Sequence, residues 1–316
     1  MTVWRSLGTA VLQFLMRLGL ACACLALVPA QAVAARVAVV LSEDTAPYQE
    51  IYQVIRSHLD AGPHETRRIY AEDLIVSSLD EARLVVAVGV RAAESLATQP
   101  LRMPVLAVLV PRAWYVRTGH ASLSTDRGVA SAIFIDQPFD RQARLLRLAL
   151  PDVKRVGVLL SAEQGGLANE LNAALRTQQL AAVHGTLAPG ERLIPSLESV
   201  LSGADVLLAV PDPQIFNRST AQSLFLTSYR YRVPVLGYSH SLTRAGALLS
   251  LHSSPAQIGR QTAEWVSAAI RGAEVVLPPP AHPDYFSVSV NEQVARSLGL
   301  ALPPAAELDQ RLGGGR

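Results

Sequence analysis

The strongest constraint on the fold is a repeated alternation of short apolar runs with segments whose apolar residues have helical spacing. Residues 82–97, ARLVVAVGVRAAESLA, are a clear example. Their apolar run Leu84–Val88 suits a strand buried on both faces, and Gly89 then turns the chain into a helix-like segment. The same pattern predicts strands at 36–41, 66–70, 84–89, 104–110, 129–135, 155–161, 181–187, 205–210, 234–238, 247–252 and 286–291.

Two of the intervening segments show where helices should begin and end. Residues 139–150 place apolar side chains on one face and arginines elsewhere, and Pro151 stops the helix. In residues 254–272, Ser254 is a typical N-cap, Pro255 suits the first helical position, and Gly272 is expected at the exit. Strands that alternate with helices in this way predict parallel sheets joined by right-handed crossovers.

The pattern restarts at residues 152–161, DVKRVGVLLS, which favours two similar α/β halves over one large sheet. Each half is expected to be a three-layer sandwich. Because about 280 residues remain after the N-terminal segment, chain length also favours two domains. The C-terminal tail is 304–316, and its ending, LDQRLGGGR, is expected to be frayed.

Residues 1–34 have the features of a secretory signal peptide. Arg5 and Arg17 precede an apolar stretch, which small residues at A-x-A spacing follow. Cleavage is expected after Ala34, with Ala35 as the near alternative, and a retained membrane anchor is the competing interpretation. Lipoprotein anchoring is not expected, since neither cysteine of the chain, Cys22 or Cys24, has Leu three positions before it. The remaining chain contains no cysteine, which excludes disulfides, thiol catalysis and thiolate-bound metal.

Charge gives no indication of a polyanionic partner. Residues 1–34 contain two of the 28 basic residues and none of the 26 acidic ones, so the remainder has 26 of each sign. A net charge near zero does not steer a protein towards nucleic acid or anionic lipid. No second apolar run is long enough to span a bilayer. We therefore expect a soluble exported protein that binds no nucleic acid.

Common catalytic and cofactor motifs are absent. No G-x-G-x-x-G follows the strand that ends at Gly89, no phosphate-binding loop occurs around the single lysine, Lys154, and no G-x-S-x-G is present. The seven histidines have no close metal-ligand spacing. The sequence therefore proposes no catalytic residue, no metal site and no cofactor.

Several segments together resemble the substrate-binding proteins of ABC transporters, in the group that includes tryptophan- and tyrosine-binding members. The most specific are LPDVKRVGVL, AGALLSLHSSPAQIGRQ and VNEQVARSLGLALP, and the ordered set covers nearly the whole chain after residue 34. The resemblance implies two Rossmann-like lobes, as in type I periplasmic binding proteins, joined by a hinge of several chain crossings. Lobe one would comprise 36–133 plus 253–275, and lobe two 136–252 plus 283–303.

In such folds ligands bind outside the carboxyl ends of parallel strands. In lobe one this implies Gly89 and Arg91 at a helix start, where N–H groups can receive a carboxylate. Arg112 and Trp114 follow another strand, and arginine can clamp a carboxylate with two hydrogen bonds. Glu43, Asp44 and Asp136 also follow strands, although capping or turn roles explain them equally well. A tight turn and a surface loop are the competing interpretations of the other positions.

In lobe two the corresponding candidates follow three strands. They are Ser161 and Glu163, Asp212 and Gln214, and Tyr238, Ser239 and His240. His252 lies where the chain is expected to cross back to lobe one, so it is either a ligand contact or a hinge hydrogen bond.

The leading hypothesis is a periplasmic solute-binding component of an ABC importer. It would close two lobes on a small organic anion or amino acid and present it to a permease in the inner membrane. The turns after Gly89, Val110 and Ser161 depart from the family pattern. We therefore retain a second hypothesis, that the protein is a periplasmic subunit that docks on a sensor kinase or outer-membrane receptor without transport. An exported enzyme is a third hypothesis, for which no catalytic constellation is found.

Overall fold

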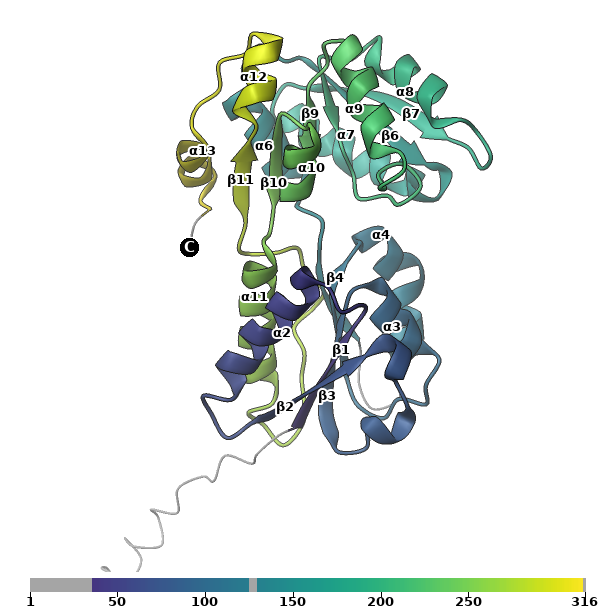
Figure 1. Cartoon of the computed structure of the whole chain (residues 1–316), viewed down its shortest axis with the longest axis vertical. Coiled ribbons are helices and arrows are strands. Elements are labelled where there is room, and N and C mark those ends of the chain that lie inside the picture. Colours follow the sequence, from purple (N-terminus) through teal and green to yellow (C-terminus); the bar gives the residue numbers. More distant parts are fainter. Residues whose placement is uncertain (1–35, 125–129, 315–316) are drawn as a thin grey trace, which may run out of the picture. The chain divides into compact units, whose positions relative to one another are not determined.

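The computed structural model describes residues 36–124 and 130–314, and the predicted signal peptide, 1–34, lies outside them. The described chain contains two α/β sheets (Figure 1). A five-stranded sheet has the order β2-β1-β3-β4-β5, and a six-stranded sheet has the order β11-β10-β9-β8-β6-β7. The predicted two-sheet α/β class is therefore confirmed.

The five-stranded sheet is parallel throughout. Its strands are β1 (Arg36–Leu41), β2 (Glu65–Tyr70), β3 (Ala82–Val88), β4 (Val105–Val110) and β5 (Ser131–Phe134). Successive residues of β1 pack into two different clusters: Val37 and Val39 contact residues of α2 (Ala46–Leu59) and α11 (Pro255–Ala269), whereas Ala38 and Val40 pack with residues of α3 (Val90–Ala97). Helices cover both faces, which explains why these strands are uninterrupted apolar runs.

The six-stranded sheet follows the same principle. Its strands are β6 (Arg155–Ser161), β7 (Ala181–Leu187), β8 (Val206–Leu208), β9 (Val235–Gly237), β10 (Leu249–His252) and β11 (Ser287–Val290). One core cluster contains residues of α6 (Phe139–Ala149), α7 (Ala168–Thr177) and α12 (Glu292–Leu298). The other contains residues of α8 (Leu193–Leu201) and α9 (Ala221–Arg230), with α10 (His240–Ala245) packed against it.

One strand runs against the predicted parallel arrangement. β11 pairs antiparallel with β10, in the register Leu249↔Val290 to His252↔Ser287. The chain leaves the six-stranded sheet through β10 and re-enters it through β11. Since the two strands adjoin the same connection but run in opposite directions, they form an antiparallel edge pair.

Three connections between the sheets are held together by hydrogen bonds. Gln137 Nε2 donates to Ser253 Oγ over 2.9 Å, and Ser253 Oγ donates to the carbonyl of Tyr285 over 2.6 Å. His282 Nδ1 lies 2.8 Å from the carbonyl oxygen of Asp136. The three crossings thus form one hydrogen-bonded group, as a multi-crossing hinge requires, while the exact lobe boundaries stay a prediction.

The capping of α11 is as the sequence indicates, but its end differs slightly. Ser254 accepts from the backbone N–H of Gln257, whose side chain accepts from the backbone N–H of Ser254, and Pro255 is the first helical residue. The helix ends at Ala269 with Ile270 as its C-cap, before Gly272.

The prediction that the C-terminal tail LDQRLGGGR is frayed is wrong for its first five residues, Leu308–Leu312. Residues Ala305–Leu312 form helix α13, with Leu308 and Leu312 buried in the core cluster that contains α6. Asp309 also accepts from the backbone N–H of Val288 in β11, over 2.6 Å. The glycine-rich ending made this helix hard to recognise in the sequence, although its two leucines, four residues apart, lie on one helix face.

We predict that Leu308→Ala lowers the free energy of unfolding by roughly 2–5 kcal/mol, because it removes a fully buried leucine from the core. Gln310→Ala, on the exposed face of the same helix, is the control and should change stability little. Urea unfolding followed by circular dichroism measures both. Equal effects of the two substitutions would mean that α13 does not belong to the core.

Candidate functional site

A cavity of about 580 Å³ lies at the carboxyl ends of strands from both sheets. From lobe one it is lined by α3 and by the segment that follows β4. From lobe two it is lined by the segments that follow β6, β8 and β9. The lining residues are Val90, Arg91, Glu94, Leu109, Pro111, Ala113, Trp114, Arg117, Ile135, Ser161, Glu163, Gln164, Pro211, Asp212, Pro213, Gln214, Phe216 and Tyr238.

A bulge in β4 gives the cavity one of its apolar side chains. Leu109 has a φ of 58°, and the register with β5 shifts between Val108 and Val110. Both valines are buried in the core, whereas Leu109 lines the cavity. A non-glycine residue in this region costs about 1–3 kcal/mol and is retained where surrounding structure fixes it, often at functional sites. The apolar run that contains Leu109 gave no sign of the bulge.

Gly89 forms a tight turn before helix α3, and a buried side chain of the protein itself binds a backbone N–H group at the start of that helix. Its φ is 88°, and a Cβ there would lie 2.5 Å from Ser42 Oγ. That hydroxyl donates to the carbonyl of Val88 over 2.8 Å and accepts from the backbone N–H of Ala92 over 3.0 Å. Ser42 therefore satisfies one of the N–H groups at the start of this helix, which the sequence analysis expected to bind a ligand.

The segment after β4 holds an indole at the cavity wall. Trp114 Nε1 donates to Glu94 Oε1 over 3.2 Å, and the side chain is largely buried. A π-helical turn, Tyr115–Gly119, follows, and a Cβ on Gly119 would lie 2.5 Å from the indole. The absence of a side chain at Gly119 thus makes room for the Trp114 ring.

In lobe two a buried carboxylate holds two strand ends together. Asp212 is 3% exposed and accepts from the backbone N–H of Ser161 over 3.2 Å and of Gln214 over 2.9 Å. Phe216 packs edge-on against Tyr238. Burial, reinforced by nearby carboxylates including that of Asp212, raises the pKa of Tyr238 to about 12. Tyr238 therefore remains a neutral hydroxyl at physiological pH.

Gln164 carries an unusual polar atom at the same place. Its Nε2 donates to the carbonyl of Pro211 over 2.9 Å, and the residue is 7% exposed. Its Oε1 is buried and has no hydrogen-bond partner among the described residues. An unpaired buried acceptor is costly, which makes this atom a candidate partner for a donor on a ligand.

Five of the predicted site residues line the cavity: Arg91, Ser161, Glu163, Asp212 and Tyr238. Trp114 and Gln214, which follow strands by the same reasoning, line it too. Sequence reasoning missed Leu109, Gln164 and Phe216. The polar turn after Ser161 was the available signal for Gln164, but no signal distinguished it from its neighbours.

The other candidates in lobe one lie outside the lining. Glu43 and Asp44 are exposed after β1, where Asp44 accepts from Gln49, and Gly89 serves the turn described above. Arg112 pairs with Glu170 over 2.5 Å. Its backbone N–H donates over 2.7 Å to Asp136, a carboxyl whose pKa burial raises to about 6.

His240 and His252 form a separate polar cluster around one serine. His240 Nδ1 lies 3.0 Å and His252 Nε2 lies 2.8 Å from Ser289 Oγ, and the two rings are 5.8 Å apart. Burial of His252, together with the neighbouring His240, lowers the pKa of His252 to about 4. Both imidazoles lie outside the cavity lining.

The charges that line the cavity nearly balance. Two arginines, Arg91 and Arg117, line it together with three acidic residues, Glu94, Glu163 and Asp212. Arg117 pairs with Glu163 over 2.9 Å. Arg91 lies 3.6 Å from Glu72, with both side chains exposed. Within residues 36–124 and 130–314, no group of three or more His, Cys, Asp or Glu residues could hold a metal ion. The arrangement suits a ligand that carries both an anionic group and hydrogen-bond donors.

Two α/β lobes, hydrogen-bonded crossings and a cavity at the strand ends define the architecture of a two-lobed binding protein. The family described as ABC transporter substrate binding protein matches residues 73–306, and the chain belongs to that family. Its members typically act outside the cytoplasm. No helix in the described part of the chain is long and apolar enough to cross a bilayer.

Solved structures share the fold at low identity. A ligand-free, open substrate-binding protein with adhesive properties from Clostridium difficile has a TM-score of 0.65 and 17% identity, covering 85% of this chain and 96% of its own. An ABC domain in complex with L-Trp from Streptococcus pneumonia has a TM-score of 0.62 and 17% identity, covering 87% and 97%. A periplasmic ribose ABC transporter protein from Conexibacter woesei has a TM-score of 0.53 and 11% identity, covering 87% of this chain and 97% of its own. A search of the curated proteins finds no match.

The lowered pKa of His252 predicts sensitivity to acid. Its folded pKa, about 4, lies below the ordinary 6.5, so its contribution to stability is present above pH 6.5 and is lost as pH falls towards 4. In His252→Gln the free energy of unfolding should decrease less than in wild type between pH 6.5 and pH 4, by up to about 3 kcal/mol. Urea unfolding at pH 7.5, 5.5 and 4.5 measures this. His184→Gln, at an exposed site, should keep the wild-type slope, and the same slope in His252→Gln would contradict the assignment.

Proposed function

We propose that this protein is the periplasmic solute-binding component of an ABC importer. The observation that carries the proposal is the cavity at the strand ends, lined from both lobes, in a chain of the substrate-binding family. A ligand held there contacts both lobes at once, so it stabilises the conformation in which the lobes are closed. The closed protein would then be presented to a permease in the inner membrane.

The ligand we propose is an amino acid with an apolar side chain. Trp114, Phe216 and Leu109 supply an apolar surface, and Arg91 supplies a cation for a carboxylate. The free Oε1 of Gln164 and the nearby carboxylates suit an ammonium group. A simple organic anion would leave these acceptors unpaired, which makes it the weaker candidate. The L-Trp complex of the streptococcal neighbour is compatible with this ligand class.

One observation favours the alternative of a sensor or receptor subunit that docks without transport. Arg91, Arg112 and Arg117 each lie within ion-pairing distance of a carboxylate of the chain itself. Their charges are therefore compensated without a ligand. A partner would then be a sensor kinase or an outer-membrane receptor.

A thermal-shift screen of residues 35–316 separates these functions. The panel contains amino acids, their desamino analogues, small carboxylates and sugars. A ligand at about 100 times its dissociation constant stabilises by roughly 2.7 kcal/mol, which raises Tm by several degrees in a chain of this size. We expect amino acids with large apolar side chains to give the largest shifts. A well-folded protein that no compound stabilises would instead favour the docking role.

Two substitutions test the orientation of the ligand. Gln164→Met keeps the side-chain size but removes the acceptor, so it should lower affinity for the amino acid about tenfold while affecting its desamino analogue little. Arg91→Ala should weaken both compounds, because both retain the carboxylate. Isothermal titration calorimetry of wild type and both variants with the two compounds gives the six dissociation constants. Parallel losses for both compounds in Gln164→Met would place the ammonium group elsewhere. Unchanged affinity in Arg91→Ala would show that Arg91 does not bind the carboxylate.

Arg112→Ala is the matched comparison for Arg91. It removes a second arginine of the same lobe, whose guanidinium pairs with Glu170 and lies outside the lining. We expect it to change ligand affinity less than Arg91→Ala does. A larger loss in Arg112→Ala would mean that this guanidinium reaches the ligand when the lobes close.

A further inference from the structure

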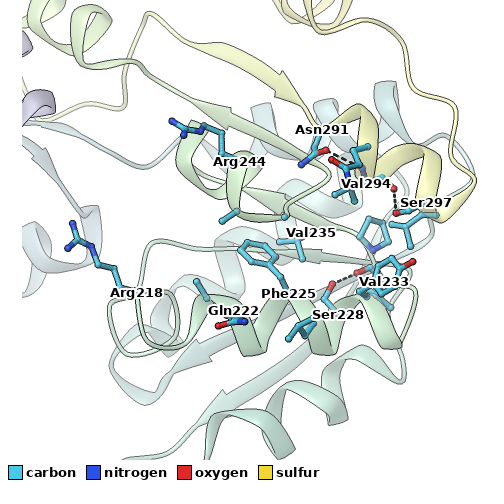
Figure 2. A pocket seen from close by; sticks show the side chains of 18 residues that line it. Arg218, Gln222, Phe225, Ser228, Val233, Val235, Arg244, Asn291, Val294 and Ser297 are labelled. Atoms are coloured by element: carbon cyan, nitrogen blue, oxygen red, sulfur yellow. Dashed lines mark hydrogen bonds between the residues drawn. The ribbon is translucent and has the colours of Figure 1, made fainter.

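A second cavity, of about 690 Å³, lies in lobe two between helices α9, α10 and α12 (Figure 2). Phe225 and Val235 lie between helix α9 and the segment that contains α12, and Asn291, Val294 and Ser297 line the α12 side. None of its lining residues lines the cavity at the strand ends. We call it the α9–α12 groove.

The charged side chains that line the α9–α12 groove are all positive. Arg218 and Arg244 line it and lie at the same end (Figure 2), and no Asp or Glu lines it. In the described part of the chain, neither guanidinium makes an ion pair or a hydrogen bond with another residue. The carboxylate of Glu292, at the start of α12, lies 3.4 Å from Arg296. The two arginines therefore have no internal counter-charge.

The sequence around the groove has the same bias over a longer range. Between Asp212 and the end of β10 at His252 the chain contains no acidic residue, although it contains four arginines: Arg218, Arg230, Arg232 and Arg244. Elsewhere exposed arginines are commonly paired, as Arg36 is with Glu65 and Arg155 with Asp205. An acid-free stretch in a chain that has equal numbers of charges after residue 34 concentrates positive charge on this part of lobe two.

The groove also exposes apolar surface. Leu226 is 58% exposed and Tyr229 is 54% exposed on α9, and both line the groove beside the buried ring of Phe225. Aromatic and arginine side chains are the residue types enriched where protein interfaces are most energetically important. A small anion would pair with the arginines but would leave this apolar surface uncovered. An extended occupant satisfies both.

We infer that the α9–α12 groove binds an acidic segment of a partner protein that also carries a large apolar residue. Carboxylates of the segment pair with Arg218 and Arg244, for which the planar guanidinium offers two parallel hydrogen bonds. The apolar side chain packs against Phe225, Leu226 and Tyr229. This inference does not depend on the ligand of the other cavity.

Selection from a displayed library of random heptapeptides against residues 35–316 tests the inference. Enriched peptides should contain at least two Asp or Glu residues and one Leu, Phe or Trp. The best peptide is then synthesised with a fluorescent label, and its Kd is measured by anisotropy. Reversing both charges, in Arg218→Glu with Arg244→Glu, should weaken binding at least about tenfold, and raising the salt concentration should also weaken it. Arg144→Glu with Arg176→Glu makes the same change in net charge at exposed positions of α6 and α7, outside the groove lining, and should retain binding within about threefold.

Four results would overturn the inference. One is the absence of enrichment, or enrichment of peptides that are not acidic. Another is unchanged binding after both charges at Arg218 and Arg244 are reversed. Displacement of the peptide by millimolar citrate or phosphate would identify a small-anion site instead. Self-association in sedimentation velocity that the peptide abolishes would identify a second copy of this chain as the occupant. Thermal shifts with amino acids are read separately, so this inference and the proposed transport role can fail independently.

Discussion

The structure depends on one constraint: its central strands are buried on both faces. Strands β1, β3 and β4 are covered by helices on either side, so their interior positions must be apolar and cannot carry binding chemistry. Polar side chains are then confined to the segments that follow the strands. Because the strands of each sheet run largely parallel, these segments gather at one edge. The candidate site is therefore a direct consequence of how the core is packed.

The same constraint explains how much of the fold could be predicted from the sequence. Each predicted strand exists, and in most of them the local signal is an apolar run bounded by turn residues, although β2 contains two arginines. The antiparallel direction of β11 was not predictable, since it depends on the route of the chain between two sheets. Helix α13 was missed because its polar and glycine-rich surroundings concealed the spacing of Leu308 and Leu312. Local pattern specifies an element, whereas tertiary contacts decide whether a weak element is retained.

The site was predictable in position but only partly in its residues. Arg91, Asp212 and Tyr238 line the cavity because they lie within four residues of a strand end. Arg112 also follows a strand, yet Glu170, distant in sequence, pairs with its guanidinium outside the lining. Leu109 enters the cavity through a bulge that leaves no trace in an apolar run. Gln164 is distinctive only because its neighbours leave one acceptor unpaired, which is a property of packing and not of sequence.

The central claim is that a ligand joins the two lobes. Because residues 35–316 contain no cysteine, Thr98→Cys and Ser199→Cys introduce two unique spin-labelling sites, one in each lobe. Double electron–electron resonance then measures the distance between the labels with and without a compound that raises Tm. We predict that the compound shifts the distance distribution and narrows it, because both lobes bind the same molecule. A stabilising compound that leaves the distribution unchanged would contradict closure of the lobes around a shared ligand.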